Sequence, residues 1–567
     1  MKTKTNNNFD AIVIGSGISG GWAAKELAEK GLNVLVLERG KEMRHGLDYT
    51  GEHVPTWDLP FNGKPDRELE SRDYAIQSQS YAFMASNIQF WNNDRLNPYQ
   101  HNPDKPFTWT RGDHVGGRSL MWGRQSYRFS EQDFNANAKD GHGKPWPVTY
   151  QEIAPWYSHV EKFIGVNGKK EGLPQLPDGD FQKPMPWYHL EKEIQKKLKA
   201  ARPDITLTNA RTAILTESLP GRSACHYCGP CENGCSTGSY FSSQSSTLPA
   251  ALATGNVTIR ANALVERLEY DNNTQKISQV CVVDTKTNER SQYSAKVVFL
   301  CASTIASTQL LLNSANEHFP TGLANSSGVL GHYLMDHFSG IGAAGLFTNY
   351  SNYYYHGNRP TGLYVPRFRN LSNDEDLGFV RGYGFQTNTS RSSWIGSFNA
   401  PGIGAEYKNN LTQPKHWTFY VGGFGECLPQ KRNKLYLTNK KDRFGVPQVA
   451  FDFEWSDNEK AMAKDIKQQA KDIVTKAGAS FSIEFGDDKN LSTPGAAIHE
   501  MGTARMGHNP NQSVLNKYNQ AHDINNLFIT DGSFMASSSC VNPSLTYMAF
   551  TARACDYAVK QLKSGNI

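Results

Sequence analysis

The sequence lacks a long apolar run. None of its segments reaches the ~20 consecutive apolar residues that cross a bilayer. Residues 1–10 are polar and lack the apolar core of a secretion signal. We therefore expect a soluble chain that does not insert into a membrane and that is exported only if another protein carries it.

A large excess of charge is also missing, because the formal net charge of the 567 residues is only +5. A protein that binds mainly nucleic acid concentrates basic residues on one face, so we expect no nucleic acid partner. The nine cysteines are an odd number, and four of them lie within residues 225–235. This pattern excludes a secreted disulfide framework and indicates a metal or cluster site.

A βαβ unit is predicted at the N-terminus. Residues 9–14 form a short β-branched run that is typical of a buried parallel strand, and residues 18–30 follow a helical pattern. Residues 33–37 form a second strand that ends at Glu38. Between strand and helix, Gly15, Gly17 and Gly20 form the pattern G-x-G-x-x-G.

These glycines predict a dinucleotide site. Gly15 permits a tight turn, Gly17 allows a pyrophosphate to approach the backbone, and Gly20 allows the helix and strand to pack closely. The helix N-terminus favours phosphate charge, and Glu38 can accept a hydrogen bond from a ribose hydroxyl. The unit alone leaves FAD and NAD as alternatives.

Further elements follow along the chain. After about residue 330, alternating stretches indicate an antiparallel sheet. Ser456 and Glu459 form a capping box at the start of a helix. The other predicted elements are antiparallel strands at 257–270 and 277–283, buried strands at 295–300 and 527–530, and helices at 190–200, 305–313 and 544–563.

Five motifs give the chain a family resemblance. Besides the glycine turn, they are G-G-R-S-L-M-W-G at 116–123, the segment 298–312, H-E-M-G-T-A-R-M-G at 499–507, and V-N-P-S-L-T at 541–546, which follows D-G-S at 531–533. Together they resemble the glucose–methanol–choline (GMC) oxidoreductases, and within them the branch of pyranose oxidases and bacterial glucoside 3-dehydrogenase and glucose dehydrogenase catalytic subunits.

The resemblance implies an α/β fold with α+β elements. A Rossmann-like FAD-binding domain is expected from residues 1–45, 108–130, 205–330 and 499–567. A discontinuous substrate-binding domain, built on an antiparallel sheet, is expected from residues 46–107, 131–204 and 331–498.

The resemblance also implies FAD as the cofactor and assigns its site. His499 and Asn542 are expected to flank the flavin ring as the catalytic pair. Neutral imidazole is a suitable base near pH 7, and an amide can hold the substrate oxygen without titrating. The cofactor-binding residues are expected to be Gly15, Ser16, Gly17, Ile18, Ser19, Gly20, Glu38, Arg39, Gly116, Gly117, Arg118, Met121, Trp122, Gly123, Val265, Ala302, Asp531, Gly532, Asn542, Pro543 and Ser544.

Met121 predicts how the flavin is held. Relatives with covalently bound flavin carry a histidine at this position of the glycine loop. A thioether cannot form the histidyl link, so we expect dissociable FAD.

The cysteine run, with spacing C-x2-C-x2-C-x3-C, predicts an iron–sulfur cluster in the loop 222–240. Ferredoxin-type runs share this spacing, although Ser236 replaces their proline. Zinc, stray thiols or a disulfide remain alternatives. The FAD-dependent glucose and glucoside dehydrogenases have a three-cysteine [3Fe–4S] motif that corresponds to Cys225, Cys231 and Cys235. The additional Cys228 leaves [4Fe–4S] open.

The expected function is oxidation of a sugar or glycoside hydroxyl, with electrons leaving through the cluster. We favour C3 of a glucoside, and Tyr353, Tyr354 and Tyr355 are candidates for stacking on the sugar. Alternatives are a glucose C1 dehydrogenase, an oxygen-using pyranose oxidase and a non-catalytic electron-transfer subunit. Expected partners are a small subunit or a cytochrome c-type acceptor, and co-export with that subunit would place the chain in the periplasm.

Overall fold

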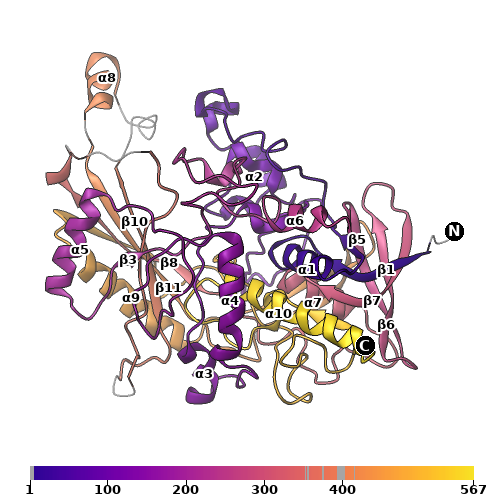
Figure 1. Ribbon diagram of the computed structural model, residues 1–567. Coiled ribbons are helices and arrows are strands. Elements are labelled where there is room, and N and C mark those ends of the chain that lie inside the picture. Colours follow the sequence, from indigo (N-terminus) through magenta and orange to yellow (C-terminus); the bar gives the residue numbers. More distant parts are fainter. Residues whose placement is uncertain (1–4, 352, 354–356, 373–375, 392–401, 414) are drawn as a thin grey trace.

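A computed structural model gives the fold for residues 5–351, 353, 357–372, 376–391, 402–413 and 415–567. Two large sheets lie side by side, and both chain termini lie at the outer end of the first (Figure 1). Tyr354 and Tyr355 lie outside the described residues. The expected mixed α/β fold, with one largely parallel and one antiparallel sheet, is confirmed.

The first sheet combines a parallel and an antiparallel part. Its parallel strands, in spatial order, are β4 (Val257–Arg260), β2 (Val34–Leu37), β1 (Thr5–Ile14), β7 (Arg290–Leu300) and β15 (Leu527–Ile529). From β7 the sheet continues antiparallel through β6 (Lys276–Asp284) and β5 (Ala263–Asp271). The centre of β1 and β2 is buried on both faces. One face packs against α1 and α10, and the other faces a second apolar cluster that includes residues of β5.

Two helices from opposite ends of the chain pack together on this sheet. They are α1 (Ile18–Glu29) and α10 (Ser544–Lys563). Small residues such as Ala24 and Ala554 lie in one buried cluster with Val13 of β1, which lets helices and strands approach closely. α7 (Thr304–Asn313) and α6 (Thr247–Ala253) complete this half. The first and the last helix of the chain therefore pack against each other.

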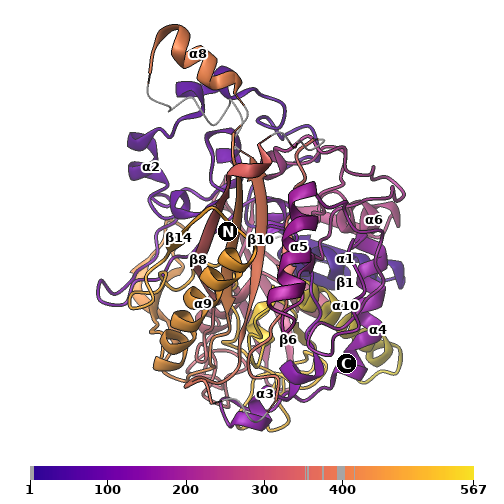
Figure 2. The ribbon, with the colours of Figure 1, turned by 90° about the vertical axis from the view of Figure 1, so that its left-hand side faces the viewer.

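The second sheet is antiparallel. Its order is β14 (Phe481–Phe485), β8 (Phe338–Phe347), β11 (Trp417–Gly425), β10 (Tyr383–Arg391), β9 (Leu363–Val365) and β3 (Thr208–Asn209). The helices α9 (Asp457–Lys476) and α5 (His189–Ala201) cover one face (Figure 2). The backbone N–H of Ser456 donates to Glu459 Oε2 at 2.6 Å, as the predicted capping box requires.

Some elements differ from the prediction or were not predicted. β4 runs parallel to β2, not antiparallel, because the chain crosses over through α6 before it. α4 (Tyr150–Ile164) packs against α10, although its segment was expected in the substrate-binding part. β3 joins the antiparallel sheet from a segment expected in the cofactor-binding part. The remaining elements of four or more residues include α2 (Arg67–Asp73), α3 (Glu131–Asp140), α8 (Gly404–Thr412) and the hairpin β12 (Lys434–Lys441) and β13 (Pro447–Asp452).

Among the described residues, none of the helices has the length and apolar character needed to cross a membrane.

Candidate active site

The glycine turn between β1 and α1 is packed backbone against backbone. Gly15 has φ +99°, and a Cβ there would lie 2.5 Å from the carbonyl oxygen of Cys301. A Cβ on Gly20 would lie 1.9 Å from the carbonyl oxygen of Gly15. A Cβ on Gly17, in contrast, would have no atom within 4 Å. Gly15 and Gly20 are thus required by the fold, whereas Gly17 leaves space for a ligand.

Glu38, at the end of β2, is held against this turn. Its carboxylate accepts hydrogen bonds from Ser16 Oγ at 2.6 Å and from the N–H of Gly40 at 2.9 Å. Burial raises the pKa of Glu38 above its ordinary value. The side chain lines the same cavity as Gly17, where it can meet a ribose hydroxyl.

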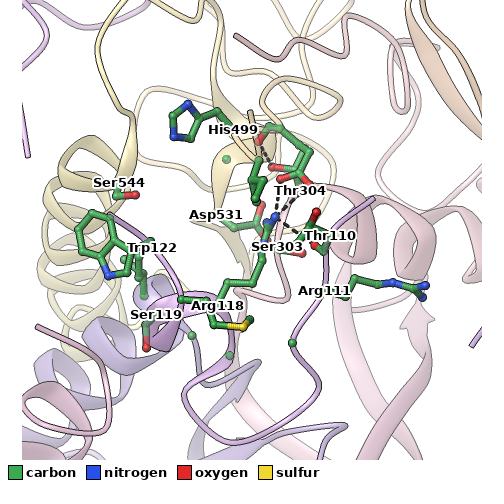
Figure 3. Close-up of a pocket in the computed structure, with 18 of the residues that line it drawn as sticks. Thr110, Arg111, Arg118, Ser119, Trp122, Ser303, Thr304, His499, Asp531 and Ser544 are labelled. Atoms are coloured by element: carbon green, nitrogen blue, oxygen red, sulfur yellow. Dashed lines mark hydrogen bonds and ion pairs between the residues drawn. The ribbon is translucent and has the colours of Figure 1, made fainter. Parts of the chain in front are cut away.

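The turn opens into a cavity of about 860 Å³ that segments from the whole chain enclose (Figure 3). The cavity is lined by His499 and by all the predicted cofactor-binding residues except Gly20 and Gly116. Gly20 packs inside the turn, and the N–H of Gly116 donates to Ser16 Oγ at 2.9 Å. The structure therefore brings together residues that are up to about 500 positions apart.

The lining also includes polar atoms with no partner in the described structure. Trp109 Nε1, Thr110 Oγ1 and Arg111 Nε are buried without a hydrogen bond. A buried polar group without a partner costs about 1–3 kcal/mol, so these atoms favour a polar ligand in the cavity. With the space above Gly17, they fit a large dinucleotide such as FAD. These residues were not predicted as part of the site, because no sequence motif marks residues 109–111.

The loop that carries His499 is held by Asp336. This buried carboxylate accepts hydrogen bonds from the backbone N–H groups of Gly495, Ala497 and His499 at 2.8, 3.3 and 3.0 Å. Burial, followed by the nearby Glu500, raises the pKa of Asp336 to about 7. Ile498 adopts φ +62°, a left-handed conformation that is unusual for a β-branched residue. The loop is thus strained and needs an external support.

The His499 side chain lies beside Asn542, as the motifs predict. Asn542 Nδ2 donates to His499 Nε2 at 3.2 Å, and Asn542 Oδ1 accepts from Gln386 Nε2 at 2.7 Å. Gln386 comes from β10 of the antiparallel sheet, and no local pattern marks it in the sequence. The pair and its amide partner line one wall of the cavity.

The electrostatics of this wall keep His499 neutral. Burial first, then His337 and Arg118, lower the pKa of His499 well below its ordinary value. Arg118 itself pairs with Glu500 at 2.9 Å and donates to the carbonyl oxygen of Thr110 at 3.3 Å (Figure 3). A neutral imidazole beside an amide can accept a proton from a bound alcohol.

The cavity wall near His499 is polar with one aromatic side. Phe424 lies with its ring centre 6.0 Å from that of His499. Other side chains with hydrogen-bonding capacity lining the cavity are Gln125, Thr361, Gln386, Asn388 and Tyr420. Such a wall can bind a small molecule with several hydroxyl groups.

The cysteine loop borders the cavity through Glu232 and Tyr240. Cys225, Cys231 and Cys235 pack against one small apolar cluster that contains Tyr240, whereas Cys228 is exposed. Across the described residues, however, no three His, Cys, Asp or Glu side chains are placed so that they could hold a metal ion. The four thiols share one loop but do not form a ligand set in this structure.

Comparisons with known proteins identify the family. The family models described as GMC oxidoreductase match residues 9–339 and 429–551. The chain is 29% identical to 2-methyl-1,2-propanediol dehydrogenase of Mycolicibacterium austroafricanum, covering 98% of this chain and 96% of the relative. It is 27% identical to the fructose dehydrogenase large subunit of Gluconobacter japonicus, covering 98% of each chain.

A solved structure shows the same fold. A formate oxidase variant of Aspergillus oryzae, studied for FAD modification, superposes with a TM-score of 0.62 at 15% identity, covering 99% of this chain and 100% of that chain. The two family models together span most of the sequence, including the segments near both chain ends that line the cavity. The chain therefore belongs to the GMC oxidoreductase family, and it is a flavin-dependent oxidoreductase that acts on CH–OH groups.

Proposed function

We propose that this protein is an FAD-dependent dehydrogenase that oxidises a hydroxyl group of a sugar or glycoside. The favoured carbon is C3 of a glucoside, which gives a 3-keto sugar. The observation that carries the proposal is the hydrogen-bonded cluster of His499, Asn542 and Gln386 on one wall of the cavity.

The cluster supports oxidation of an alcohol. FAD bound in this cavity would accept the hydride that leaves the carbinol carbon with both bonding electrons. His499 Nε2 takes the hydroxyl proton, and the oxygen becomes a carbonyl. The Asn542 amide holds that oxygen and cannot titrate. The hydroxyl proton thus ends on His499, and the substrate leaves as a ketone.

The polar wall supports a polyhydroxyl substrate. Gln125, Thr361 and Asn388 can bind hydroxyl groups that do not react, and Phe424 offers an apolar face. One relative is named for the sugar that it oxidises, fructose. The preference for C3 follows from the resemblance to glucoside 3-dehydrogenases.

An acceptor other than oxygen is part of the proposal. The support is the position of the cysteine loop beside the cavity, with Cys225, Cys231 and Cys235 gathered on one apolar cluster and Cys228 outside it. We expect iron and acid-labile sulfide in the purified protein. Cys231→Ser should lose both, whereas the matched Cys228→Ser should keep them if the cluster is [3Fe–4S]. Flavin without iron or sulfide would contradict this part.

The remaining proposals concern the acceptor protein, export and flavin attachment. A small subunit or a cytochrome c-type protein would accept the electrons. Co-export with the subunit would place the chain in the periplasm, and the chain expressed alone should stay in the cytoplasm.

Met121 lines the cavity at the position where relatives form the histidyl link. Acid precipitation should therefore release FAD, and flavin that stays with the polypeptide would contradict dissociable binding.

An anaerobic titration tests the central proposal. The purified protein is mixed with glucose, methyl glucosides and disaccharides while flavin bleaching is followed, and the product is identified by NMR. We expect methyl glucosides, whose C1 is blocked, to bleach the flavin and to give a 3-keto product. Bleaching by free glucose alone would indicate C1 oxidation, and no bleaching by any sugar would overturn the sugar assignment.

A further inference from the structure

A second histidine lies behind His499, outside the cavity lining. His337 directly follows Asp336 and precedes β8. Its side chain is 1% exposed. Its Nδ1 lies 2.8 Å from His499 Nδ1, and the two rings meet edge to face at 86°. His337 cannot touch a substrate in the cavity, so any role in the reaction must act through His499.

The hydrogen bonds fix where the protons of the two rings are. His337 Nε2 lies 2.8 Å from the carbonyl oxygen of Ser539, which can only accept, so His337 Nε2 carries the hydrogen. Burial lowers the pKa of His337 to about 4, so the ring is neutral and its Nδ1 has a lone pair. The short contact between the two Nδ1 atoms then requires His499 Nδ1 to be the donor.

A neutral ring that carries its hydrogen on Nδ1 has a lone pair on Nε2. That atom is the one beside Asn542, on the cavity side of the ring. The amide of Asn542 donates to it, which agrees with the same assignment. The chain of hydrogen bonds is consistent from the Ser539 carbonyl through both rings to Gln386.

We infer that His337 is a positioning residue that holds His499 in the tautomer with its lone pair on Nε2, ready to accept the substrate proton. The inference rests on the proposed role of His499 as the base. Two neighbouring residues hold His499 in different ways. Asp336 binds its backbone N–H, and His337 binds its ring. A base held in the wrong tautomer presents an N–H to the substrate and cannot accept a proton.

Replacing His337 by Asn or by Gln tests the roles of its two ring nitrogens separately, because each amide preserves the hydrogen bond of only one of them. Asn places an amide oxygen near the position of Nδ1, where it can still accept from His499 Nδ1. Gln reaches the position of Nε2 and can still donate to the Ser539 carbonyl, but it leaves His499 Nδ1 without its acceptor. The pair therefore preserves similar polarity and differs in the contact that sets the tautomer.

The test measures flavin reduction by substrate in an anaerobic stopped-flow experiment on the full chain with bound FAD. His337→Gln should lower the rate constant of reduction by about 10–100-fold, as for other residues that orient a reacting group. The substrate concentration for half-maximal rate should not change, because His337 does not line the cavity. His337→Asn should keep a rate close to that of the wild type.

A double-mutant cycle distinguishes positioning from a merely structural role. In a His499→Ala background, His337→Gln should cause no further loss, since its effect passes through His499. An unchanged rate in the single His337→Gln variant, or an equal loss in both backgrounds, would overturn the inference. If the Gln variant does not hold FAD, His337→Phe, which keeps the ring volume, takes its place in the cycle.

The two possible failures are distinguishable. If His499→Ala reduces its flavin at the wild-type rate, the proposed function fails. If His499→Ala is impaired but His337→Gln is not, the base stands and only the positioning role of His337 fails.

Discussion

Two loops border the flavin cavity and are held in opposite ways. The glycine turn, residues 15–20, is fixed by the absence of side chains, because Gly20 packs on the Gly15 carbonyl at a distance that excludes a Cβ. The histidine loop, residues 495–499, is fixed by side chains that lie about 160 positions earlier in the chain, Asp336 and His337. One loop requires residues that lack a side chain, and the other requires polar side chains from a distant part of the chain.

The difference shows how each loop serves the reaction. The glycine turn must let a ligand approach the backbone, so small residues are sufficient. The histidine loop must aim one nitrogen at a substrate, which requires fixed backbone and fixed ring. A left-handed residue such as Ile498 costs about 1–3 kcal/mol, and the three hydrogen bonds to Asp336 offset that cost. Substitutions in the two loops should therefore fail in different ways.

The largest effect is expected from His499→Ala. Loss of the base should lower the rate constant of flavin reduction by about 10²–10⁴-fold, the usual contribution of a general base. Because the glycine turn is untouched, FAD content should stay at the wild-type level, which absorbance at the flavin band measures. Loss of FAD together with activity would show that the two loops are not independent.

Gly20→Ala should be the most damaging change in the glycine turn. Its Cβ would lie 1.9 Å from a backbone oxygen, so we expect a loss of about 3 kcal/mol in the free energy of unfolding, at the upper end of overpacking effects. Gly17→Ala is the matched control, since its Cβ meets no protein atom within 4 Å. The control should unfold like the wild type without flavin but bind FAD more weakly. Equal destabilisation of both apoproteins in urea would contradict this reading.

Asp336→Asn should loosen the histidine loop and leave the glycine turn intact. An amide turns one N–H toward a backbone donor, and we expect the free energy of unfolding to fall by about 2 kcal/mol at neutral pH, the cost of an unmatched buried group. Flavin reduction should slow, while FAD stays bound.

The same variant carries a pH signature. The pKa of Asp336 is raised from 3.8 to about 7 in the fold. The folded state therefore holds the proton more tightly, and this carboxyl stabilises the fold most below pH 3.8 and loses that contribution as pH rises toward 7. Asn does not titrate, so the stability advantage of the wild type over the variant should shrink across this range. A constant difference would show that the carboxyl keeps its ordinary pKa.

The smallest effect concerns the pH dependence of flavin reduction. The pKa of His499 lies well below 6.5 because of burial, His337 and Arg118. A base must be neutral, so the rate should stay constant as pH is lowered through 6.5 and fall only at more acidic values. An acid limb centred at or above pH 6.5 would contradict the burial of His499 in the working enzyme.

Sequence patterns predicted the elements whose shape is local. The strand–turn–helix unit at residues 9–37 and the helix at 544–563 appear where expected because apolar periodicity and capping residues are properties of neighbouring positions. The helix α4 was missed, although Thr149 and Glu152 form a capping box at its start, because Pro155 lies inside its pattern. No local sequence pattern marks the crossover before β4. The predicted antiparallel pairing of this strand was therefore wrong, and it pairs parallel to β2.

The sequence by itself determined the glycine turn, the His499 and Asn542 motifs and the family, since each depends on residue types at fixed spacing. Only the tertiary structure placed Gln386, Asp336 and His337 around the base. The physical reason is that a hydrogen bond depends on distance in space, and the residues that orient His499 come from strands and loops more than 100 positions away in the chain.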